Sequence, residues 1–103
     1  MRGDEPGDEM PEEVVLPVED WIDLHTFLPK DVRSVIEEYL EQAILAGMTE
    51  VRIVHGRGVG VQRDIVRAAL SRHSRVEWFG DAPPEQGGRG ATLVRLAAGR
   101  RDA

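Results

Sequence analysis

The sequence predicts an α/β fold: a two-layer β-α-β-α-β-β sandwich with two main helices packed on a mixed four-stranded sheet. Short segments rich in β-branched residues alternate with two longer segments of helical periodicity. Two β-α-β units in series favour parallel pairing with right-handed crossovers, and the last two strands can pair as a hairpin. The chain has 103 residues, which suits one domain of this size.

The first half of the predicted fold is a short strand and a long helix. Residues 21–25 alternate apolar and polar side chains, as a half-buried strand does. A helix should begin at Pro29, because proline fits the first helical turn. Apolar residues then recur at intervals of three and four, forming one stripe: Val32, Val35, Ile36, Tyr39, Leu40, Ala43 and Ile44. Gly47 follows this stripe and is expected to end the helix as residue C′.

The second half predicts one more helix and three strands. β-Branched residues indicate a strand at residues 49–55. Glycines interrupt it, and a second helix is expected at about residues 61–73. A third strand at residues 75–79 leads into a Pro/Gly-rich loop, residues 82–90. This loop is long for a hairpin connection and is therefore a functional candidate. The last strand is predicted at residues 91–96.

Charge is distributed unevenly along a chain whose formal net charge is −6. Residues 1–20 hold eight acidic residues and one basic residue, whereas from Val51 onward ten arginines stand against five acidic residues. The planar guanidinium group of arginine suits phosphate, so the body of the domain is a candidate for binding a polyanion. The alternative is that the acidic segment aids solubility and the arginines form a solvated surface.

Composition predicts four segments and a compartment. We expect a disordered acidic tail at residues 1–13, an N-terminal extension packing on the domain at 14–20, the domain itself at 21–96, and a frayed C-terminal tail at 97–103. The absence of cysteine excludes disulfides and thiolate metal sites and suits a reducing compartment. No apolar run approaches the roughly 20 residues of a membrane span, and no secretory signal is evident. We therefore expect a cytoplasmic protein with no membrane partner.

Asp23 and His25 are candidate catalytic residues. Alternate residues of a strand share a face, so both side chains should point the same way near the end of the first strand. Histidine ordinarily titrates near pH ~6.5 and can act as general base or acid, while a neighbouring carboxylate orients its ring. The other interpretation is a polar pair that merely closes the strand end.

A glycine-rich run, residues 55–60, joins the second strand to the second helix. Glycine lets backbone N–H groups approach an anion closely, and a helix N-terminus adds partial positive charge. Arg57 and Arg63 could add charge beside it. The run is not a dinucleotide-binding G-x-G-x-x-G loop, because the two-residue gap before the last glycine is missing. A tight turn that needs positive φ is an equally good interpretation.

The loop before the last strand is the third candidate. Glycines at residues 87, 88 and 90 permit either close backbone approach or a mobile connection. Arg89 and the hydroxyl of Thr92 are suitable contacts for phosphate or sugar.

In this order and spacing, the three segments at residues 22–25, 55–60 and 87–92 resemble the Smr (small MutS-related) domain. The resemblance covers roughly Leu16 to Leu96, and the chain looks like a stand-alone member of that family. It implies a β-α-β-α-β-β sandwich similar to the C-terminal domain of translation initiation factor three. It also implies nuclease activity, since some Smr domains nick DNA and others cleave RNA, including messenger RNA on stalled ribosomes.

The family motifs transfer to individual positions of this chain. Its leucine/isoleucine-Asp-x-His motif corresponds to Ile22, Asp23 and His25, its His-Gly-x-Gly motif to His55, Gly56 and Gly58, and its Gly-x-Gly-x-Thr-like loop to Gly88, Gly90, Ala91 and Thr92. Two departures concern local geometry. Thr26 stands where the family often has glycine, and Leu28-Pro29 stands where a Ser or Thr cap often opens the first helix.

The resemblance and the residues together predict a nucleic-acid-binding endonuclease. His25 is expected to act as general base or acid, with Asp23 orienting it. The residues expected to contact nucleic acid are His55, Gly56, Arg57, Gly58, Gly60, Arg63, Gly88, Arg89, Gly90 and Thr92. A DNA substrate favours Mg²⁺ or Mn²⁺ held by Asp23, whereas the 2′-OH of RNA can attack without a metal.

The expected partners are DNA or RNA, with the ribosome as a further candidate, and the chain is expected to be a monomer. Two alternatives stay open. One is a non-catalytic module that docks on nucleic acid or a ribosome, and the other is a nucleotide-binding regulator that uses the glycine-rich loop.

Overall fold

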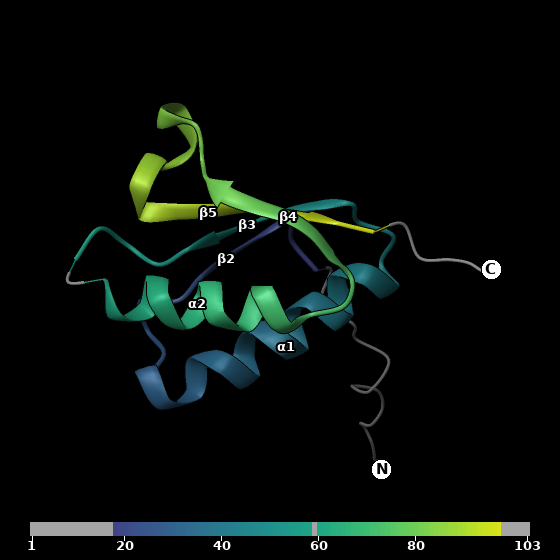
Figure 1. The fold of residues 1–103 in the computed structure, drawn as a ribbon, viewed down its shortest axis with the longest axis horizontal. Helices are drawn as coiled ribbons and strands as arrows, with labels where there is room; N and C mark the ends of the chain where they lie inside the picture. The colour runs from purple at the N-terminus through teal and green to yellow at the C-terminus, as the bar shows by residue number, and fades with distance from the viewer. Residues whose placement is uncertain (1–17, 59, 98–103) are drawn as a thin grey trace, which may run out of the picture.

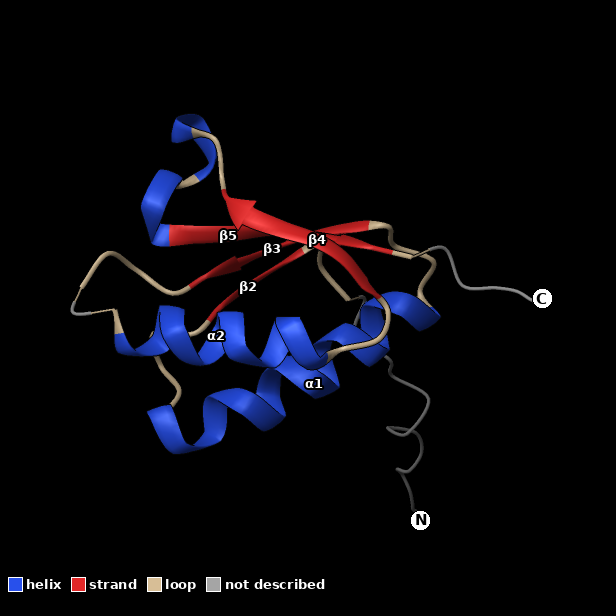
Figure 2. Ribbon diagram, viewed as in Figure 1, coloured by secondary structure: helices blue, strands red, loops and turns tan. Residues whose placement is uncertain are grey.

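The computed structural model describes residues 18–58 and 60–97, which fold into two layers, a four-stranded sheet with two helices on one of its faces (Figures 1 and 2). The elements in chain order are β2 (Trp21–Asp23), α1 (Pro29–Leu45), β3 (Glu50–Val54), α2 (Val61–Arg72), β4 (Val76–Asp81), the single 3₁₀ turns η2 (Pro84–Gln86) and η3 (Gly88–Gly90), and β5 (Ala91–Leu96). The predicted α/β sandwich is confirmed. The predicted tail at residues 1–13, residues 14–17 of the extension and residues 98–103 lie outside the described residues.

The four strands lie in the order β2-β3-β5-β4. β2 runs parallel to β3, with Trp21 opposite Arg52, and β5 runs antiparallel to both β3 and β4. The predicted hairpin of the last two strands is therefore confirmed. The direct parallel pairing expected for the second β-α-β unit is wrong. β3 and β4 run in the same direction, but β5 lies between them and takes the hydrogen bonds of both.

Both ends of α1 form as the sequence predicts. Pro29 is the first helical residue, where its missing N–H costs no hydrogen bond. At the other end Gly47 adopts a φ of 85°. Its N–H donates to the carbonyl of Ile44 (3.0 Å), and the N–H of Met48 donates to that of Ala43 (3.0 Å). These two bonds form a Schellman motif, which ends the helix and turns the chain toward β3.

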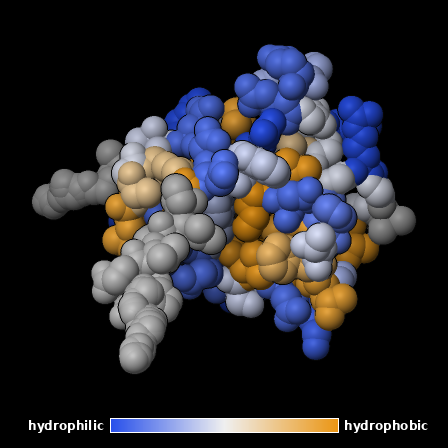
Figure 3. Space-filling view, turned by 180° about the vertical axis from the view of Figure 1, so that it is seen from behind, coloured by the Kyte–Doolittle hydropathy of each residue, from blue (hydrophilic) through white to orange (hydrophobic). Residues whose placement is uncertain are grey.

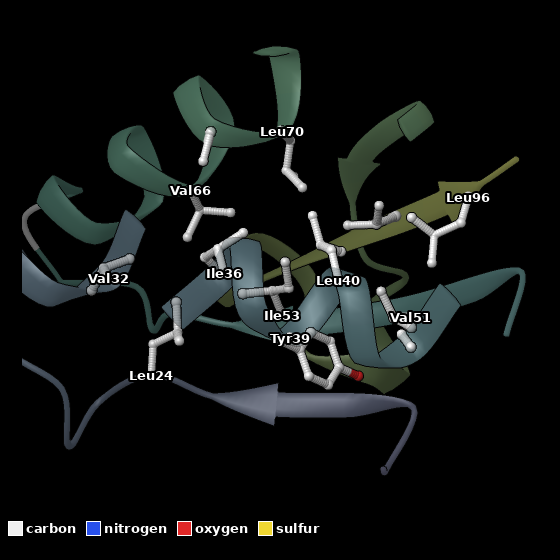
Figure 4. Packing of buried hydrophobic residues seen from close by; sticks show 13 residues of the cluster. Leu24, Val32, Ile36, Tyr39, Leu40, Val51, Ile53, Val66, Leu70 and Leu96 are labelled. Carbon is white, nitrogen blue, oxygen red and sulfur yellow. The ribbon is translucent and has the colours of Figure 1, made fainter. Parts of the chain in front are cut away.

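The hydrophobic core fills the space between the helices and the sheet (Figure 4). Its largest fully buried aliphatic side chains come from both layers: Leu24, Ile36, Leu40, Ile53, Leu70 and Leu96. Burying each of these stabilises the fold by roughly 1.5–3 kcal/mol. Val18 packs against the core from the described part of the N-terminal extension. Next to it, the hydroxyl of Tyr39 donates to the carbonyl of Glu19 (2.6 Å), which satisfies the one polar group of this cluster.

Strand direction brings three connections to one end of the molecule (Figure 1). The chain leaves β2, β3 and β4 at the same edge of the sheet, and β5 enters the sheet there. The loop that carries η2 and η3 stands off the sheet on the side away from α1 and α2 (Figure 2). Ligands of open α/β sheets bind at the carboxyl ends of the strands. We therefore expect a binding site at this edge, where β2, β3 and β4 end.

Hydrophilic side chains cover much of the face in Figure 3, with apolar patches between them. Within residues 18–58 and 60–97, neither helix is of a length and hydropathy that would let it cross a membrane.

Candidate functional site

Asp23 and His25 contact each other at the end of β2. The Oδ1 atom of Asp23 accepts two hydrogen bonds from His25, one from the backbone N–H (3.0 Å) and one from ring Nδ1 (2.9 Å). Leu24 between them is buried in the core, and its N–H donates to the carbonyl of Val54, which fixes the strand end. The strand predicted at residues 21–25 ends at Asp23, so His25 lies in the turn that follows it and not on a shared strand face, and this turn brings the two side chains together.

The electrostatics of the pair define which nitrogen of His25 is available. The backbone N–H of His25, and after it the ring, lowers the pKa of Asp23 below its ordinary value, so the carboxylate is ionised at neutral pH. A carboxylate only accepts hydrogen bonds, so Nδ1 must carry the proton that is donated to it. In the neutral form of the ring, Nε2 is then the nitrogen that carries the lone pair. The His25 side chain is 74% exposed. His25 is thus arranged as a base that faces solvent.

The two glycine-rich loops lie against each other. The carbonyl of Gly90 accepts the N–H groups of both His55 (3.0 Å) and Gly56 (2.8 Å). A Cβ atom at Gly90 would lie 3.2 Å from Cγ of Arg57, which is closer than nearly all real contacts. Glycine at this position therefore permits the close approach of the loops. Gly60, which caps α2, adopts a φ of 88° that other residues rarely take.

A surface hollow of about 480 Å³ opens between these loops and the start of α2. It is lined by Gly56, Arg57, Gly58, Gly60, Arg63 and Arg89. All six were predicted from sequence as contacts for nucleic acid. Three guanidinium groups and the N-terminus of a 12-residue helix converge here, an arrangement that favours an anion of the size of phosphate.

His55 and Thr92, also predicted as contacts, are buried and do not line this hollow. His55 is 7% exposed and Thr92 is fully buried. Nδ1 of His55 lies 2.9 Å from the carbonyl of Gly56, and Nε2 lies 2.9 Å from Oγ1 of Thr92. Because a carbonyl only accepts, the Nδ1–H donates to Gly56 and the hydroxyl of Thr92 donates to Nε2. This pair thus links the start of the glycine-rich run, residues 55–60, to β5.

The two remaining predicted contacts, Gly88 and Gly90, belong to η3. Gly90 is buried against the backbone of Gly56, and Gly88 is half-buried with a φ of 54°. A Cβ at Gly88 would lie 3.4 Å from Nη2 of Arg57. The absence of a side chain at both glycines therefore leaves the space that the Arg57 side chain occupies.

Asp81, which was not predicted from sequence, holds Arg63 at the hollow and also binds a second unpredicted residue, Arg67. Oδ1 of Asp81, at the end of β4, accepts hydrogen bonds from Nη2 of Arg63 (3.0 Å) and Nη2 of Arg67 (2.7 Å). The Arg63 bond is the main reason that the pKa of Asp81 lies below its ordinary value. Sequence signals existed for both residues. Arg67 lies one helical turn after Arg63, and Asp81 ends a strand at the same edge as Asp23.

Gln62 connects the loop of His25 to α2. Its side-chain amide donates to the carbonyls of Leu24 (3.3 Å) and Phe27 (3.1 Å), on either side of His25. The neighbouring residue on α2 is Arg63, which lines the hollow. Gln62 thus joins the catalytic candidate to the arginine-lined hollow. Nothing in the sequence pattern singles this glutamine out, because its partners are backbone atoms distant along the chain.

Asp23 was the predicted metal ligand. In the part of the chain that the structure describes, no group of three or more His, Asp or Glu residues is arranged to hold a metal ion. Oδ1 of Asp23 is engaged by His25, so Oδ2 is the oxygen that would face a divalent cation. Mg²⁺ is commonly held by one or two carboxylates together with substrate phosphates, and this single oxygen fits that mode of binding.

The residues of this site fall within a known domain family. The family model described as the Smr domain matches residues 22–97, from the strand of Asp23 to the end of β5. The chain belongs to the Smr domain family. The predicted family is therefore confirmed, and the match includes both catalytic candidates, the lining of the hollow and the buried His55–Thr92 pair.

Relatives of this Smr domain include much longer proteins. Endonuclease MutS2 of Thermus thermophilus is 40% identical over 75 residues, which are 73% of this chain and 10% of the relative. Endonuclease MutS2 of Aquifex aeolicus is 38% identical over 98 residues, 92% of this chain and 13% of the relative. The chain thus spans about a tenth of the length of the curated relatives it matches.

Two solved structures share the fold. The Smr domain of Thermus thermophilus MutS2 has a TM-score of 0.70 at 39% identity, covering 74% of this chain and 95% of that one. YdaL, a stand-alone small MutS-related protein from Escherichia coli, has a TM-score of 0.67 at 28% identity, covering 79% and 66% of the two chains. This Smr domain is therefore similar both to part of a long protein and to a stand-alone one.

Proposed function

We propose that this Smr domain is an endonuclease that binds DNA or RNA and cleaves its phosphodiester bonds. The observation that carries the proposal is the exposed His25 base, held by Asp23 at the same edge of the sheet as a hollow lined by three arginines. Relatives named as endonucleases support it. Acid–base groups move the protons of phosphodiester cleavage, and anion-binding groups stabilise the charge that develops on the phosphate.

In the proposed reaction, Nε2 of His25 removes the proton from the attacking oxygen. That oxygen forms a bond to phosphorus, the bond from phosphorus to the leaving oxygen breaks, and the proton on His25 is available to the leaving oxygen. Arg57, Arg63 and Arg89 offset the charge that accumulates on the phosphate oxygens. A bound Mg²⁺ or Mn²⁺ on Asp23 would add Lewis-acid stabilisation of the same charge.

Two nucleophiles are compatible with this base. The 2′-OH of RNA attacks the adjacent phosphorus and leaves a cyclic phosphate, whereas water attacks DNA and leaves a linear phosphate. Treatment with EDTA and analysis of the product ends therefore separate the two reactions.

A cleavage assay tests the proposal. Supercoiled plasmid and a structured RNA are each incubated with the parent protein, with His25→Ala and with the control His73→Ala, in Mg²⁺, Mn²⁺ or EDTA. His73 lies at the far end of α2 and pairs with Glu41, so its loss should leave the rate unchanged. Loss of a general base lowers the rate about 10²- to 10⁴-fold, which is the result expected for His25→Ala.

Three other outcomes would contradict the proposed mechanism. Equal rates for the parent and His25→Ala would remove His25 from the reaction. Binding without any product, in all three buffers, would favour a docking module on nucleic acid or a ribosome. Failure to bind either substrate would contradict a nucleic-acid function altogether.

The monomeric state and association with the ribosome stay predictions. Gel filtration would check the first, and co-sedimentation with ribosomes the second.

A further inference from the structure

The face of the sheet opposite the helices carries two exposed tryptophans. Trp21 on β2 is 41% exposed, and Trp78 on β4 is 45% exposed. An arginine lies over each ring, with the guanidinium carbon of Arg52 5.9 Å from the centre of Trp21 and that of Arg95 5.3 Å from the centre of Trp78. The two tryptophans thus have the same chemistry and nearly the same exposure, but they lie on β2 and β4, the two outermost strands of the sheet.

Only Trp21 lies next to the catalytic candidates. Leu24 is buried and Ile22 packs against the core, so Trp21 and Asp23 share the open face of β2. Two residues of a strand span about 6.6 Å, so Trp21 lies a short distance along β2 from Asp23. Trp78 is three strands away, at about 14 Å from β2.

We propose that Trp21 and Arg52 form a stacking subsite for one unpaired nucleobase next to the phosphodiester bond that His25 attacks. The proposal rests on the proposed function and specifies its substrate as nucleic acid that is single-stranded at the cut. Aromatic rings and guanidinium planes bind unpaired bases of any sequence by stacking. A base within a duplex has both faces covered by its neighbours and cannot use such a subsite without leaving the stack.

The position of Arg52 supports the subsite. Nη1 of Arg52 donates to the carbonyl of Gln86 (3.2 Å), in the same loop that carries Arg89 of the hollow. The stacking pair and the arginine-lined hollow are therefore connected through one loop.

Charge limits how far the substrate can extend along this face. Asp20 and Glu50 line a second hollow of about 340 Å³ beside Arg52. They stand at the starts of β2 and β3, away from His25. Two carboxylates there disfavour a second phosphate, so the subsite should hold a single nucleotide.

The two tryptophans are the only ones in the chain, which allows each to serve as a fluorescent reporter. In a His25→Ala background that prevents cleavage, Trp78→Phe leaves Trp21 as the sole tryptophan, and Trp21→Phe leaves Trp78. A short single-stranded oligonucleotide, as RNA and as DNA, is titrated into each protein, and so is the fully paired duplex. Binding is followed independently by anisotropy of a label on the oligonucleotide.

We expect the single strand to quench Trp21 and to leave Trp78 unchanged, and the duplex to quench neither. Trp21→Ala should weaken binding of the single strand about 10-fold, whereas Trp21→Phe keeps a ring and should weaken it much less. Trp78→Ala is the matched control and should change affinity less than 2-fold. Circular dichroism of each variant checks that the fold is retained.

The readouts separate failure of this proposal from failure of the proposed function. Binding by anisotropy with unchanged Trp21 emission, equal quenching of both tryptophans, or equal quenching by the duplex would each overturn the stacking subsite while leaving nucleic-acid binding intact. No change in anisotropy would overturn the proposed function, and the subsite with it.

Discussion

The buried hydrogen bond between His55 and Thr92 differs in kind from the exposed bond between Asp23 and His25. Water can replace a partner of His25, whose side chain is 74% exposed, but not a partner of His55, which is 7% exposed. A buried polar atom without a partner loses its hydration and gains nothing in return. We therefore expect the first pair to matter mainly for chemistry and the second mainly for stability.

Replacing Thr92 with valine tests the stabilising role. Valine has nearly the same shape but no hydroxyl, so Nε2 of His55 would be left without its donor. We expect the free energy of unfolding to fall by about 1–3 kcal/mol in urea titrations. Thr92→Ser keeps the hydroxyl and is the control. A Thr92→Val protein as stable as Thr92→Ser would show that the bond contributes nothing.

His55 also predicts how stability depends on pH. Burial, with smaller contributions from Arg63 and Arg67, lowers the pKa of His55 below its ordinary value. Below about pH 6.5 the unfolded chain takes up a proton at His55 while the folded chain resists it, so stability falls as the pH falls. Above about pH 6.5 both states are neutral at this residue and its contribution is complete.

Urea unfolding between about pH 7.5 and about pH 5 measures this dependence, a range that avoids the titration of Asp23 and Asp81. The His55→Gln protein should show a flatter dependence on pH than the parent, whatever its absolute stability. Parallel curves for the two proteins would contradict the assignment to His55.

At the scale of elements, the start of α2 depends on backbone conformation rather than on a side-chain cap. Gly60 precedes the helix with a φ of 88° and, as a glycine, has no side chain to cap it, whereas Gly58 in the same loop has no positive φ. Both positions have room for a Cβ, so the two glycines differ only in the need for a left-handed conformation.

We expect Gly60→Ala to lower the free energy of unfolding by about 1–2 kcal/mol, the cost of holding a residue with a Cβ in the left-handed region. Gly58→Ala should leave it unchanged or raise it by about 0.5 kcal/mol, because alanine restricts the unfolded chain. Thermal and urea unfolding of both variants measure the difference. Similar losses for the two would mean that the loop requires glycine for another reason.

The sequence predicts some of these elements better than others for physical reasons. The position and bounds of α1 can be predicted because they depend on local signals: Pro29 at its start, a continuous apolar stripe along it, and Gly47 after its end. The place of β5 between β3 and β4 has no such signal, since alternation along a strand does not specify its neighbours. The same holds within the site. Two-residue spacing brings Asp23 and His25 together, but the contact of Asp81 with Arg63 depends on strand order and so was not predicted.

At the scale of the whole molecule, charge is segregated along the chain. Residues 1–13 hold six acidic residues and one basic residue, while three arginines line the hollow. An anionic segment tethered to the domain competes with a nucleic acid for the same positive potential.

Deleting residues 1–13 should therefore tighten binding of an oligonucleotide at low salt. The gain should shrink at about 0.15 M salt, where the screening length is about 8 Å. Anisotropy titrations at the two salt concentrations measure the effect, and a chain with the six acidic residues changed to Asn or Gln is the control for segment length. Unchanged affinity after the deletion would reject the competition.

The central place of β5 also bears on how the protein is made. Among the described strands, the one that joins the two halves of the sheet, β5, comes last along the chain. While the ribosome is still translating the preceding loop, β2 and β3 can pair, but β4 has no neighbour on either side. The sheet should therefore close only after β5 has been made. A premature stop before Ala91 would then release a chain with exposed strand edges, prone to aggregation rather than merely shortened.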